Sequence, residues 1–321
     1  MRLTTRRLLA VLAGLTLVLA ACADDAEEAG DDTEEAGDEA EEAGDEAAPD
    51  PIPEDGPEIE VASFNFPESE ILGEIYAQAM EDAGYPVARS LNLGARELIY
   101  PELLGGDLDL LPEYLGSSLV VWFEQDPPAD IASGYDALSE AFAADGVSVL
   151  TPAPAENNQA FVVTADFAAD NGLSSIGDLA NAGPITFAGP PECEDRDTCF
   201  QGLVGTYGLD EVTFESIQEA AARLAALDSG DAELILLFST DAPLAGDAYV
   251  VLEDSEGMLP PENITPVVRD EVLDAYGADL TDLLEQVTAA ITTDGLQQMN
   301  AEASEGLSAA EIAEAWLADN R

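Results

Sequence analysis

The sequence contains no histidine and no lysine, and all nine of its basic residues are arginine. A catalytic triad that depends on histidine, a Schiff base on lysine and a phosphate-binding loop that ends in lysine are therefore excluded. A zinc site with histidine ligands is excluded for the same reason. Catalysis by carboxylates alone and a calcium site made of Asp and Glu remain open.

Positive charge is scarce beside a large excess of negative charge. The 321 residues include 68 acidic ones, and the formal net charge is −59 at pH 7. Nucleic acids and anionic lipid headgroups repel so acidic a chain, so neither is expected as a partner. One interpretation is a solvated acidic surface suited to high salt, where screening weakens self-repulsion. The alternative, attraction of cationic solutes, requires carboxylates in a binding cleft.

The longest apolar run lies at the N-terminus. Arg2, Arg6 and Arg7 precede residues 8–21, which are too few to cross a bilayer, so residues 1–21 are predicted to be a signal peptide. The run ends Leu-Ala-Ala-Cys22, which resembles the lipobox of bacterial lipoproteins. This implies that Cys22 is lipidated and holds the protein in the cell envelope, at the outer face of the cytoplasmic membrane. Ordinary cleavage is the alternative, and either Sec or twin-arginine export fits.

Residues 22–57 are an acidic low-complexity segment of Glu, Asp, Ala and Gly that ends in a cluster of prolines. It has too little apolar bulk to form a core, and its like charges extend it. We predict a disordered tether between the lipid anchor and the folded part.

Cysteine is rare, with only three residues in the chain. Cys193 and Cys199 are close in sequence and lie in the oxidising compartment that a signal peptide implies, which favours a local disulfide. A metal site would need more ligands than these two thiols, and a redox pair is more often spaced as C-x-x-C.

Strands alternate with helices after residue 58, which indicates βαβ units, an α/β fold and mainly parallel sheets flanked by helices. The predicted strands are residues 59–63, 85–91, 108–111, 161–164, 185–188, 212–214, 234–238, 249–252 and 264–268. The predicted helices are residues 68–83, 95–104, 173–179, 218–227, 271–276, 280–292 and 309–317.

Two breaks in this pattern predict two lobes. Pro152 and Pro154 mark a first crossing between lobes, and residues 239–245 are predicted to be the second. Residues 58–153 and 245–321 then form one lobe, and residues 154–244 form the other, with two hinge crossings between them.

Candidate binding residues follow three of the strands, because sheets of this kind bind ligands beyond the carboxyl ends of their strands. The candidates are Phe64, Asn65 and Phe66 after the first strand, Glu113, Tyr114 and Ser117 after Pro112, and Phe238, Thr240 and Asp241 at the strand of residues 234–238. Some have a structural alternative: Phe66 and Phe238 as core residues, and Glu113 as a charge that complements the positive end of a helix.

Several motifs together resemble the osmoprotectant-binding family, the ProX-like or OpuAC-like receptors for glycine betaine, choline and carnitine that serve ABC importers. They are Ser63-x-Asn65-Phe66-x-Glu68, Leu91-Asn92-Leu93-Gly94-x-Arg96-Glu97, Gly106-Asp107-Leu108-Asp109-x-x-Pro112-Glu113-Tyr114-x-Gly116, Gly189-Pro190-Pro191-Glu192-Cys193 and Phe238-Ser239-Thr240-Asp241. Pro260-Pro261-x-Asn263-Ile264 also matches, so the resemblance covers residues 58 to 320. Their order and spacing are more specific than any single motif.

The resemblance implies a two-lobed periplasmic-binding-protein fold, type II-like, that holds a trimethylammonium group among aromatic rings. Tyr114 matches an aromatic position of the family, Ser117 a hydroxyl position and Asn65 a polar position of the first loop. Asn158 and Glu192 complete the candidate list. The implied partners are a small quaternary amine and the permease subunits of an importer. We expect a monomer with no cofactor, no metal and no enzymatic reaction.

The chain also departs from the family. Phe64 stands where some betaine-binding members have lysine, and Phe238 where some relatives have tyrosine. Arg196, in the cysteine loop, is then the arginine expected to meet a ligand carboxylate. These departures favour choline, or another cation without a carboxylate, over glycine betaine. A polyamine or a polar amino acid on the same fold stays open. An enzyme is disfavoured because no carboxylate pair stands out from the acidic background, and the cleft motifs argue against a structural lipoprotein.

Overall fold

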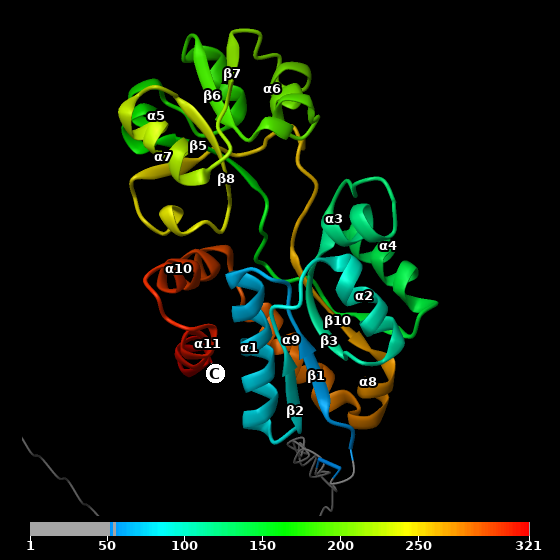
Figure 1. The fold of residues 1–321 in the computed structure, drawn as a ribbon. Coiled ribbons are helices and arrows are strands. Elements are labelled where there is room, and N and C mark those ends of the chain that lie inside the picture. The colour runs from blue at the N-terminus through cyan, green and yellow to red at the C-terminus, as the bar shows by residue number, and fades with distance from the viewer. Residues whose placement is uncertain (1–51, 54–55, 321) are drawn as a thin grey trace, which may run out of the picture. The chain divides into compact units, whose positions relative to one another are not determined.

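The computed structural model describes residues 52–53 and 56–320, so the predicted signal peptide, Cys22 and most of the predicted tether lie outside the described residues. Two five-stranded sheets organise this part of the chain (Figure 1). The first sheet contains β1 (Ile59–Ala62), β2 (Val87–Ser90), β3 (Leu110–Tyr114), β4 (Val147–Val149) and β10 (Ile264–Arg269). The second contains β5 (Gln159–Thr164), β6 (Ile185–Gly189), β7 (Val212–Ser216), β8 (Leu234–Phe238) and β9 (Tyr249–Val251).

Helices surround both sheets. Those before the first crossing are α1 (Pro67–Ala83), α2 (Arg96–Gly105), α3 (Leu115–Ser117), the π-helical turn η1 (Ser118–Trp122) and α4 (Ile131–Ala143). Those of the middle segment are α5 (Ala165–Asn171), η2 (Ile176–Asn181), η3 (Pro191–Asp195), α6 (Phe200–Gly205), α7 (Ala220–Ser229) and η4 (Ala242–Ala245). The chain closes with α8 (Asp270–Tyr276), α9 (Ala278–Ala290), α10 (Thr293–Ser304) and α11 (Ala309–Asp319).

The two sheets share one topology. Their strand orders are β2-β1-β3-β10-β4 and β7-β6-β8-β5-β9. In the first sheet β10 runs antiparallel to both of its neighbours, in the second β5 does, and the remaining pairs are parallel. Each reversed strand is the first one that the chain forms after it passes from one sheet to the other. The predicted α/β fold is confirmed, and both sheets are mixed, because in each of them four strands run in one direction and the fifth runs against them.

Two segments connect the sheets and run beside each other. Residues 150–158 lead from β4 to β5, and residues 252–263 lead from β9 back to β10. The backbone N–H of Asn157 donates to the carbonyl of Glu262 at 3.0 Å, and Glu156 pairs with Asn263 in an antiparallel bridge. The predicted return at residues 239–245 is wrong, because β9 follows it and pairs with β5 in the second sheet. The first lobe is therefore built on residues 56–150 and 264–320, and the second on residues 159–251.

Strand β3 is longer than predicted and does not end at Pro112. Pro112 lies directly opposite Pro266 of β10, and the register continues through Glu113 to Tyr114. Since neither proline has an N–H, this pair adds no hydrogen bond between the strands, and the pairs on either side keep the register. The extension carries Tyr114 to the end of the sheet, where a ligand site is expected.

The inner strands of the second sheet, β5, β6 and β8, are buried on both faces. In β5, Phe161 and Val163 pack into one core while Ala160 and Val162 pack into the other. Such two-sided burial explains the continuous apolar run of residues 234–237 in β8. The disulfide between Cys193 and Cys199 is present, and both cysteines are buried in the first of these two cores.

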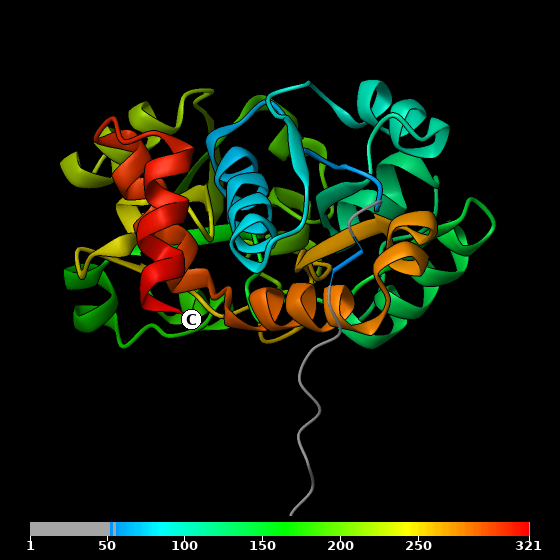
Figure 2. The ribbon, with the colours of Figure 1, turned by 90° about the horizontal axis from the view of Figure 1, so that it is seen from below.

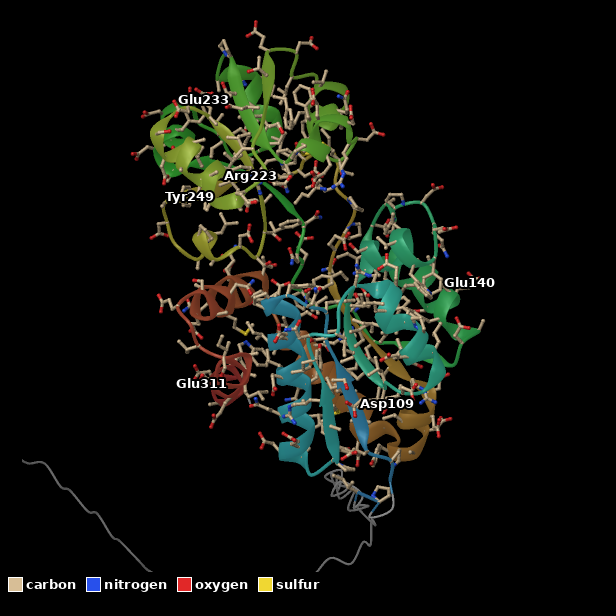
Figure 3. All side chains as sticks on the ribbon, in the orientation of Figure 1. Asp109, Glu140, Arg223, Glu233, Tyr249 and Glu311 are labelled. Atoms are coloured by element: carbon tan, nitrogen blue, oxygen red, sulfur yellow. A yellow bond between two sulfur atoms is a disulfide. The ribbon has the colours of Figure 1, made fainter. Side chains whose placement is uncertain are left out.

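The first lobe is closed by its C-terminal helices. Helix α11 packs along α1, as both Figure 1 and Figure 2 show. Tyr76 of α1 is fully buried, and its hydroxyl lies 2.8 Å from the Thr288 hydroxyl of α9. The acidic side chains lie mostly on the outside, as the labelled Glu140 and Glu311 illustrate (Figure 3). A solvated acidic surface is what the composition predicts.

Candidate functional site

A cavity of about 580 Å³ lies where the carboxyl ends of β1, β3 and β8 meet. Residues of both lobes and of both connecting segments line it. They are Phe66, Pro67, Glu68, Arg96, Tyr114, Ser117, Asn157, Phe238, Thr240, Asp241, Ala242, Glu262, Asn300, Ala303 and Ser304. The volume suits a small solute, and its place at strand ends is the one that this class of sheet uses for ligands.

Aromatic rings form part of the wall. Phe66 lies 5.9 Å from Tyr114 between ring centroids, and Phe64 stacks behind Phe66 at 5.9 Å with an interplanar angle of 5°. Phe64 is buried, whereas Phe66 has an exposed ring. Phe238 faces the cavity from the second lobe and is 50% exposed. An apolar ring that exposed beside a cavity is free to contact a ligand.

The geometry of the first loop follows from its sequence. Phe66 is extended, with φ −140° and ψ 151°, and Pro67 starts α1 in the conformation that suits the first helical position. The hydroxyl of Ser69 accepts a hydrogen bond from the Phe64 N–H at 2.9 Å, which fixes the turn. Glu68, the second residue of α1, is thereby placed at the cavity wall.

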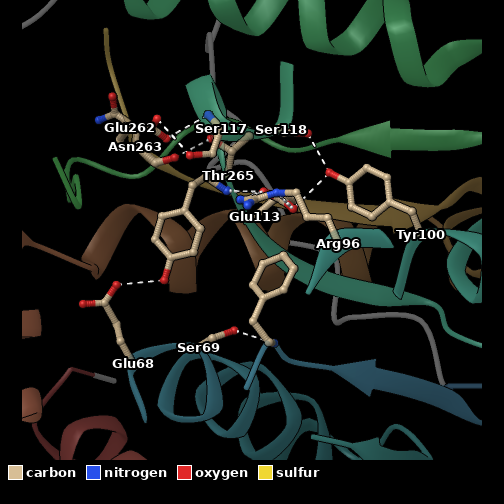
Figure 4. A network of polar contacts seen from close by, with 12 residues as sticks. Glu68, Ser69, Arg96, Tyr100, Glu113, Ser117, Ser118, Glu262, Asn263 and Thr265 are labelled. Atoms are coloured by element: carbon tan, nitrogen blue, oxygen red, sulfur yellow. Dashed lines mark hydrogen bonds and ion pairs between the residues drawn. The ribbon is translucent and has the colours of Figure 1, made fainter. Parts of the chain in front are cut away.

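An ion pair supports the wall from behind (Figure 4). Arg96 donates from Nε and Nη2 to the two carboxylate oxygens of Glu113, each at 2.8 Å. Glu113 is fully buried, and it also accepts from the Tyr100 hydroxyl at 2.9 Å and from the N–H of Tyr114 at 2.6 Å. The Arg96 guanidinium lies 4.8 Å from the centre of the Phe64 ring.

These contacts decide the ionisation of the pair. Burial disfavours the guanidinium, but the Glu113 carboxylate more than offsets this, so the pKa of Arg96 is raised above its ordinary value. The pKa of Tyr100 is raised well above its ordinary value, first by burial and then by the charge of Glu113. Tyr100 therefore stays neutral and donates to the carboxylate.

Glu68 is the most enclosed carboxylate of the cavity wall, and only 4% of it is exposed. It accepts from the Tyr114 hydroxyl, from Asn157 Nδ2 and from Asn300 Nδ2, each at 2.8 Å. Burial first, and then the charge of Glu68, raise the pKa of Tyr114 well above its ordinary value, so Tyr114 is a neutral donor.

Glu262 brings a second carboxylate from the returning connection. It accepts from the Ser117 N–H and from the Ser117 hydroxyl, both at 3.0 Å. Burial raises the pKa of Glu262 to about 7, although the Ser117 hydrogen bonds oppose the shift. Gly116 permits this approach, because a Cβ there would lie 2.8 Å from the Pro261 carbonyl oxygen.

The second lobe contributes Asp241 and the residues beside it. Asp241 accepts from the Phe238 N–H at 3.0 Å, and burial raises its pKa despite this bond, with the charge of Glu68 adding to the rise. Asn300 of α10 donates to the Thr240 carbonyl at 2.8 Å, and Gln297 donates to the Ser239 carbonyl at 2.7 Å. Helix α10 therefore binds the second lobe at the cavity edge.

The structure brings many of the predicted site residues together. Phe66, Tyr114, Ser117, Phe238, Thr240 and Asp241 line the cavity. Phe64 and Glu113 lie behind the wall and act through Phe66 and Arg96. The remaining three, Asn65, Asn158 and Glu192, are not among the lining residues. Asn65 and Glu192 are exposed, and Asn158 donates to the Pro260 carbonyl at 2.6 Å, between the two connecting segments.

Other lining residues were not predicted. Arg96, and not the exposed Arg196, is the arginine at the cavity. Asn157 and Glu262 come from the connections, and Asn300 comes from α10, which is not among the predicted helices. Its start carried a signal, since Thr292 caps the Gly295 N–H at 3.1 Å and precedes buried Leu296 and Met299 at helical spacing.

No group of His, Cys, Asp and Glu suited to a metal occurs within the described residues. Across the same described ranges, no helix is both long and apolar enough to span a membrane.

Two lobes joined by two connections, with a ligand-sized cavity between strand ends, define a solute-binding domain. The family model described as the substrate-binding domain of ABC-type glycine betaine transport systems matches residues 57–319. The chain belongs to this family.

Curated relatives agree with this assignment. The chain is 28% identical over 273 residues to the glycine betaine-binding protein YehZ of Escherichia coli K12, an alignment that covers 81% of this chain and 89% of that relative. It is 29% identical over 255 residues to a glycine-betaine-binding protein of Pseudomonas aeruginosa, covering 76% of this chain and 81% of the other. The solved structure of apo YehZ from Escherichia coli is similar with a TM-score of 0.73 at 27% identity, covering 82% of this chain and 98% of that one.

Proposed function

We propose that this chain captures a quaternary ammonium solute, such as choline, glycine betaine or carnitine, and delivers it to an ABC importer. One observation carries the proposal: Phe66 and Tyr114 of the first lobe and Phe238 of the second line the same acidic cavity. Membership of the glycine betaine transport family supports the solute class.

The chemistry of the headgroup suits this wall. A trimethylammonium group donates no conventional hydrogen bond and is weakly hydrated, so it gains little from ordinary polar side chains. An aromatic ring face attracts such a cation by about 0.5 to 2 kcal/mol. Phe66 and Phe238 are exposed enough to supply ring faces, and Tyr114 supplies a third at the back.

The charge of the lining also favours a cation. Glu68, Asp241 and Glu262 are acidic, and Arg96 is the single basic residue among the lining residues that the structure describes. Arg96 is already neutralised by Glu113. The two connections between the lobes provide a hinge, and we propose that the lobes close on the solute.

The cellular setting is part of the same proposal. The N-terminal apolar run and the Leu-Ala-Ala-Cys22 sequence support export, lipidation of Cys22 and a place at the outer face of the cytoplasmic membrane. The permease subunits of an importer are the protein partners. We propose a monomer that performs no reaction on its solute and uses no cofactor.

Calorimetric titration of the purified chain tests the solute class. We expect saturable binding, at micromolar affinity or about −8 kcal/mol, with choline, glycine betaine or carnitine. Spermidine and glutamine serve as controls for a polyamine and a polar amino acid. Binding of either control, with no heat from any quaternary amine, would overturn the proposal.

A further inference from the structure

Glu68 is a buried carboxylate without a cationic partner. Its hydrogen-bond donors are a phenol and two amides, all neutral. No arginine in the described ranges forms an ion pair with it. Buried carboxylates are ordinarily paired with a cation or bound to a metal, so a lone one at a cavity wall points to a partner from solution.

The arginines of the described chain are engaged elsewhere or lie outside the cavity. Arg89 pairs with Glu74 and Glu81, and Arg269 pairs with Asp109 and Glu271. Arg223 donates to three backbone carbonyls in the second lobe, and Arg196 is exposed away from the lining. Arg96 reaches the cavity, but Glu113 holds it through two hydrogen bonds.

Asp241 adds a second negative charge from the opposite lobe. It lines the same cavity as Glu68, and the charge of Glu68 contributes to the raised pKa of Asp241, after burial. Two carboxylates that repel each other across a cavity are both stabilised when a cation enters between them.

We propose that Glu68 is the counter-ion of the bound solute, and that it makes the site prefer a quaternary amine of net positive charge, such as choline, to a zwitterion that carries the same headgroup. This inference rests on the proposed function and narrows its solute class. Glu68 attracts the headgroup of a zwitterion as well, but it repels the carboxylate of that zwitterion, as Asp241 and Glu262 do, so its net attraction is much weaker for a zwitterion than for choline.

The contacts of Glu68 also connect the cation to the hinge. Asn157 belongs to the first connection between the lobes, and Asn300 bonds both Glu68 and the Thr240 carbonyl of the second lobe. A solute that contacts the Glu68 carboxylate therefore affects the hydrogen bonds of Asn157 and Asn300, whose positions depend on how the lobes close.

The test compares choline and glycine betaine, which share a trimethylammonium headgroup, on wild-type chain and on Glu68→Gln. Wild type should bind choline more tightly than betaine. Glu68→Gln keeps the shape of the side chain and removes its charge. It should therefore lower the affinity for choline at least about tenfold and leave the affinity for betaine within about threefold of the wild-type value. Glu70→Gln is the matched control, since it removes a charge from the same turn of α1 outside the cavity lining.

The ratio of the choline affinity to the betaine affinity separates a loss of the Glu68 charge from a general loosening of the protein. A general loosening of the hinge or of the fold lowers both affinities together and leaves the ratio unchanged, and thermal unfolding of each variant measures that loosening. A wild type that prefers betaine, or a ratio unchanged in Glu68→Gln, overturns the inference while the proposed function stands. If the wild-type chain binds no quaternary amine, the proposed function itself is wrong.

Discussion

Arg96 and Glu113 form a two-point ion pair directly behind the cavity wall, with both N–O distances at 2.8 Å. Arg96 keeps 17% of its side chain exposed, while the Glu113 side chain is fully buried. Arg96 thus brings a positive charge to the cavity wall, and the buried carboxylate of Glu113 neutralises that charge. The net field in the cavity is left to Glu68, Asp241 and Glu262.

Breaking this pair should destabilise the protein more than breaking a similar pair at the surface. Glu113→Gln leaves the partly buried Arg96 without a counter-charge, and we expect a loss of about 2 kcal/mol in the free energy of unfolding by urea. The control is Glu271→Gln, which breaks the exposed contact between Arg269 and Glu271 and should cost less than about 0.5 kcal/mol. Equal losses in the two variants would contradict the structural role given to Glu113.

Phe238 offers a direct test of the aromatic wall. Since its ring is half-exposed, Phe238→Ala should change unfolding stability by less than about 0.5 kcal/mol. It should nevertheless weaken choline binding at least about fivefold in a calorimetric titration, because one cation–π contact is lost. Phe238→Tyr keeps a ring face and should bind as wild type does. Unchanged choline affinity in the alanine variant would show that Phe238 does not contribute to the binding site.

The lining residues that were predictable from the sequence share one origin. Phe66 and Asp241 follow strands and Tyr114 is the last residue of one, and the carboxyl ends of strands are where sheets of this kind bind ligands, whatever the details of packing. The assignment of Glu113 to the cavity failed for a local reason. Neighbouring residues of a strand point to opposite faces, so Glu113 and Tyr114 cannot share one.

Other residues carried no comparable signal. Asn157 and Glu262 lie in connections whose course depends on the pairing between Glu156 and Asn263, more than 100 residues apart. The placement of the second crossing failed because residues 239–245 look like a linker, while β9 beyond them pairs back with β5. Such long-range pairing decides where the connecting segments and β9 lie in the fold. It cannot be predicted from the sequence, because it leaves no periodic pattern in the chain.

Solute binding should depend on pH through Glu262. Its pKa is raised to about 7 in the folded protein, so its proton is retained at pH values where an unfolded chain has lost it. Its contribution to folding stability is therefore present at low pH and is lost as the pH rises through about 7. A bound cation favours the ionised form, so choline affinity should rise with pH between about 5 and 7 and then level off.

Calorimetry in two buffers of different ionisation enthalpy checks this prediction. Choline binding near pH 7 should release protons, so the apparent heat should differ between the buffers. Glu262→Gln should remove most of that difference, while Asp241, whose pKa is also raised, accounts for any remainder at lower pH. Proton uptake on binding would be the wrong sign for a cationic solute.

The acidic surface should make stability depend on salt. The full sequence has a formal net charge of −59, most of it beyond residue 57, so the folded part repels itself, and at about 1 M salt the Debye length falls to about 3 Å. We expect the thermal midpoint to rise steadily with KCl up to about 2 M, measured by circular dichroism. Sucrose at matched osmolality is the control for solvent exclusion. A midpoint independent of KCl would show that the acidic residues contribute little net repulsion.

A crystal structure of the chain with choline tests the proposed binding site most directly. We expect the trimethylammonium group to lie between Phe66, Tyr114 and Phe238, with the Glu68 carboxylate among its nearest anions and the lobes closed around it. Choline bound outside this cavity, or held there without contact to any of the three rings, would show that these rings do not form the binding site.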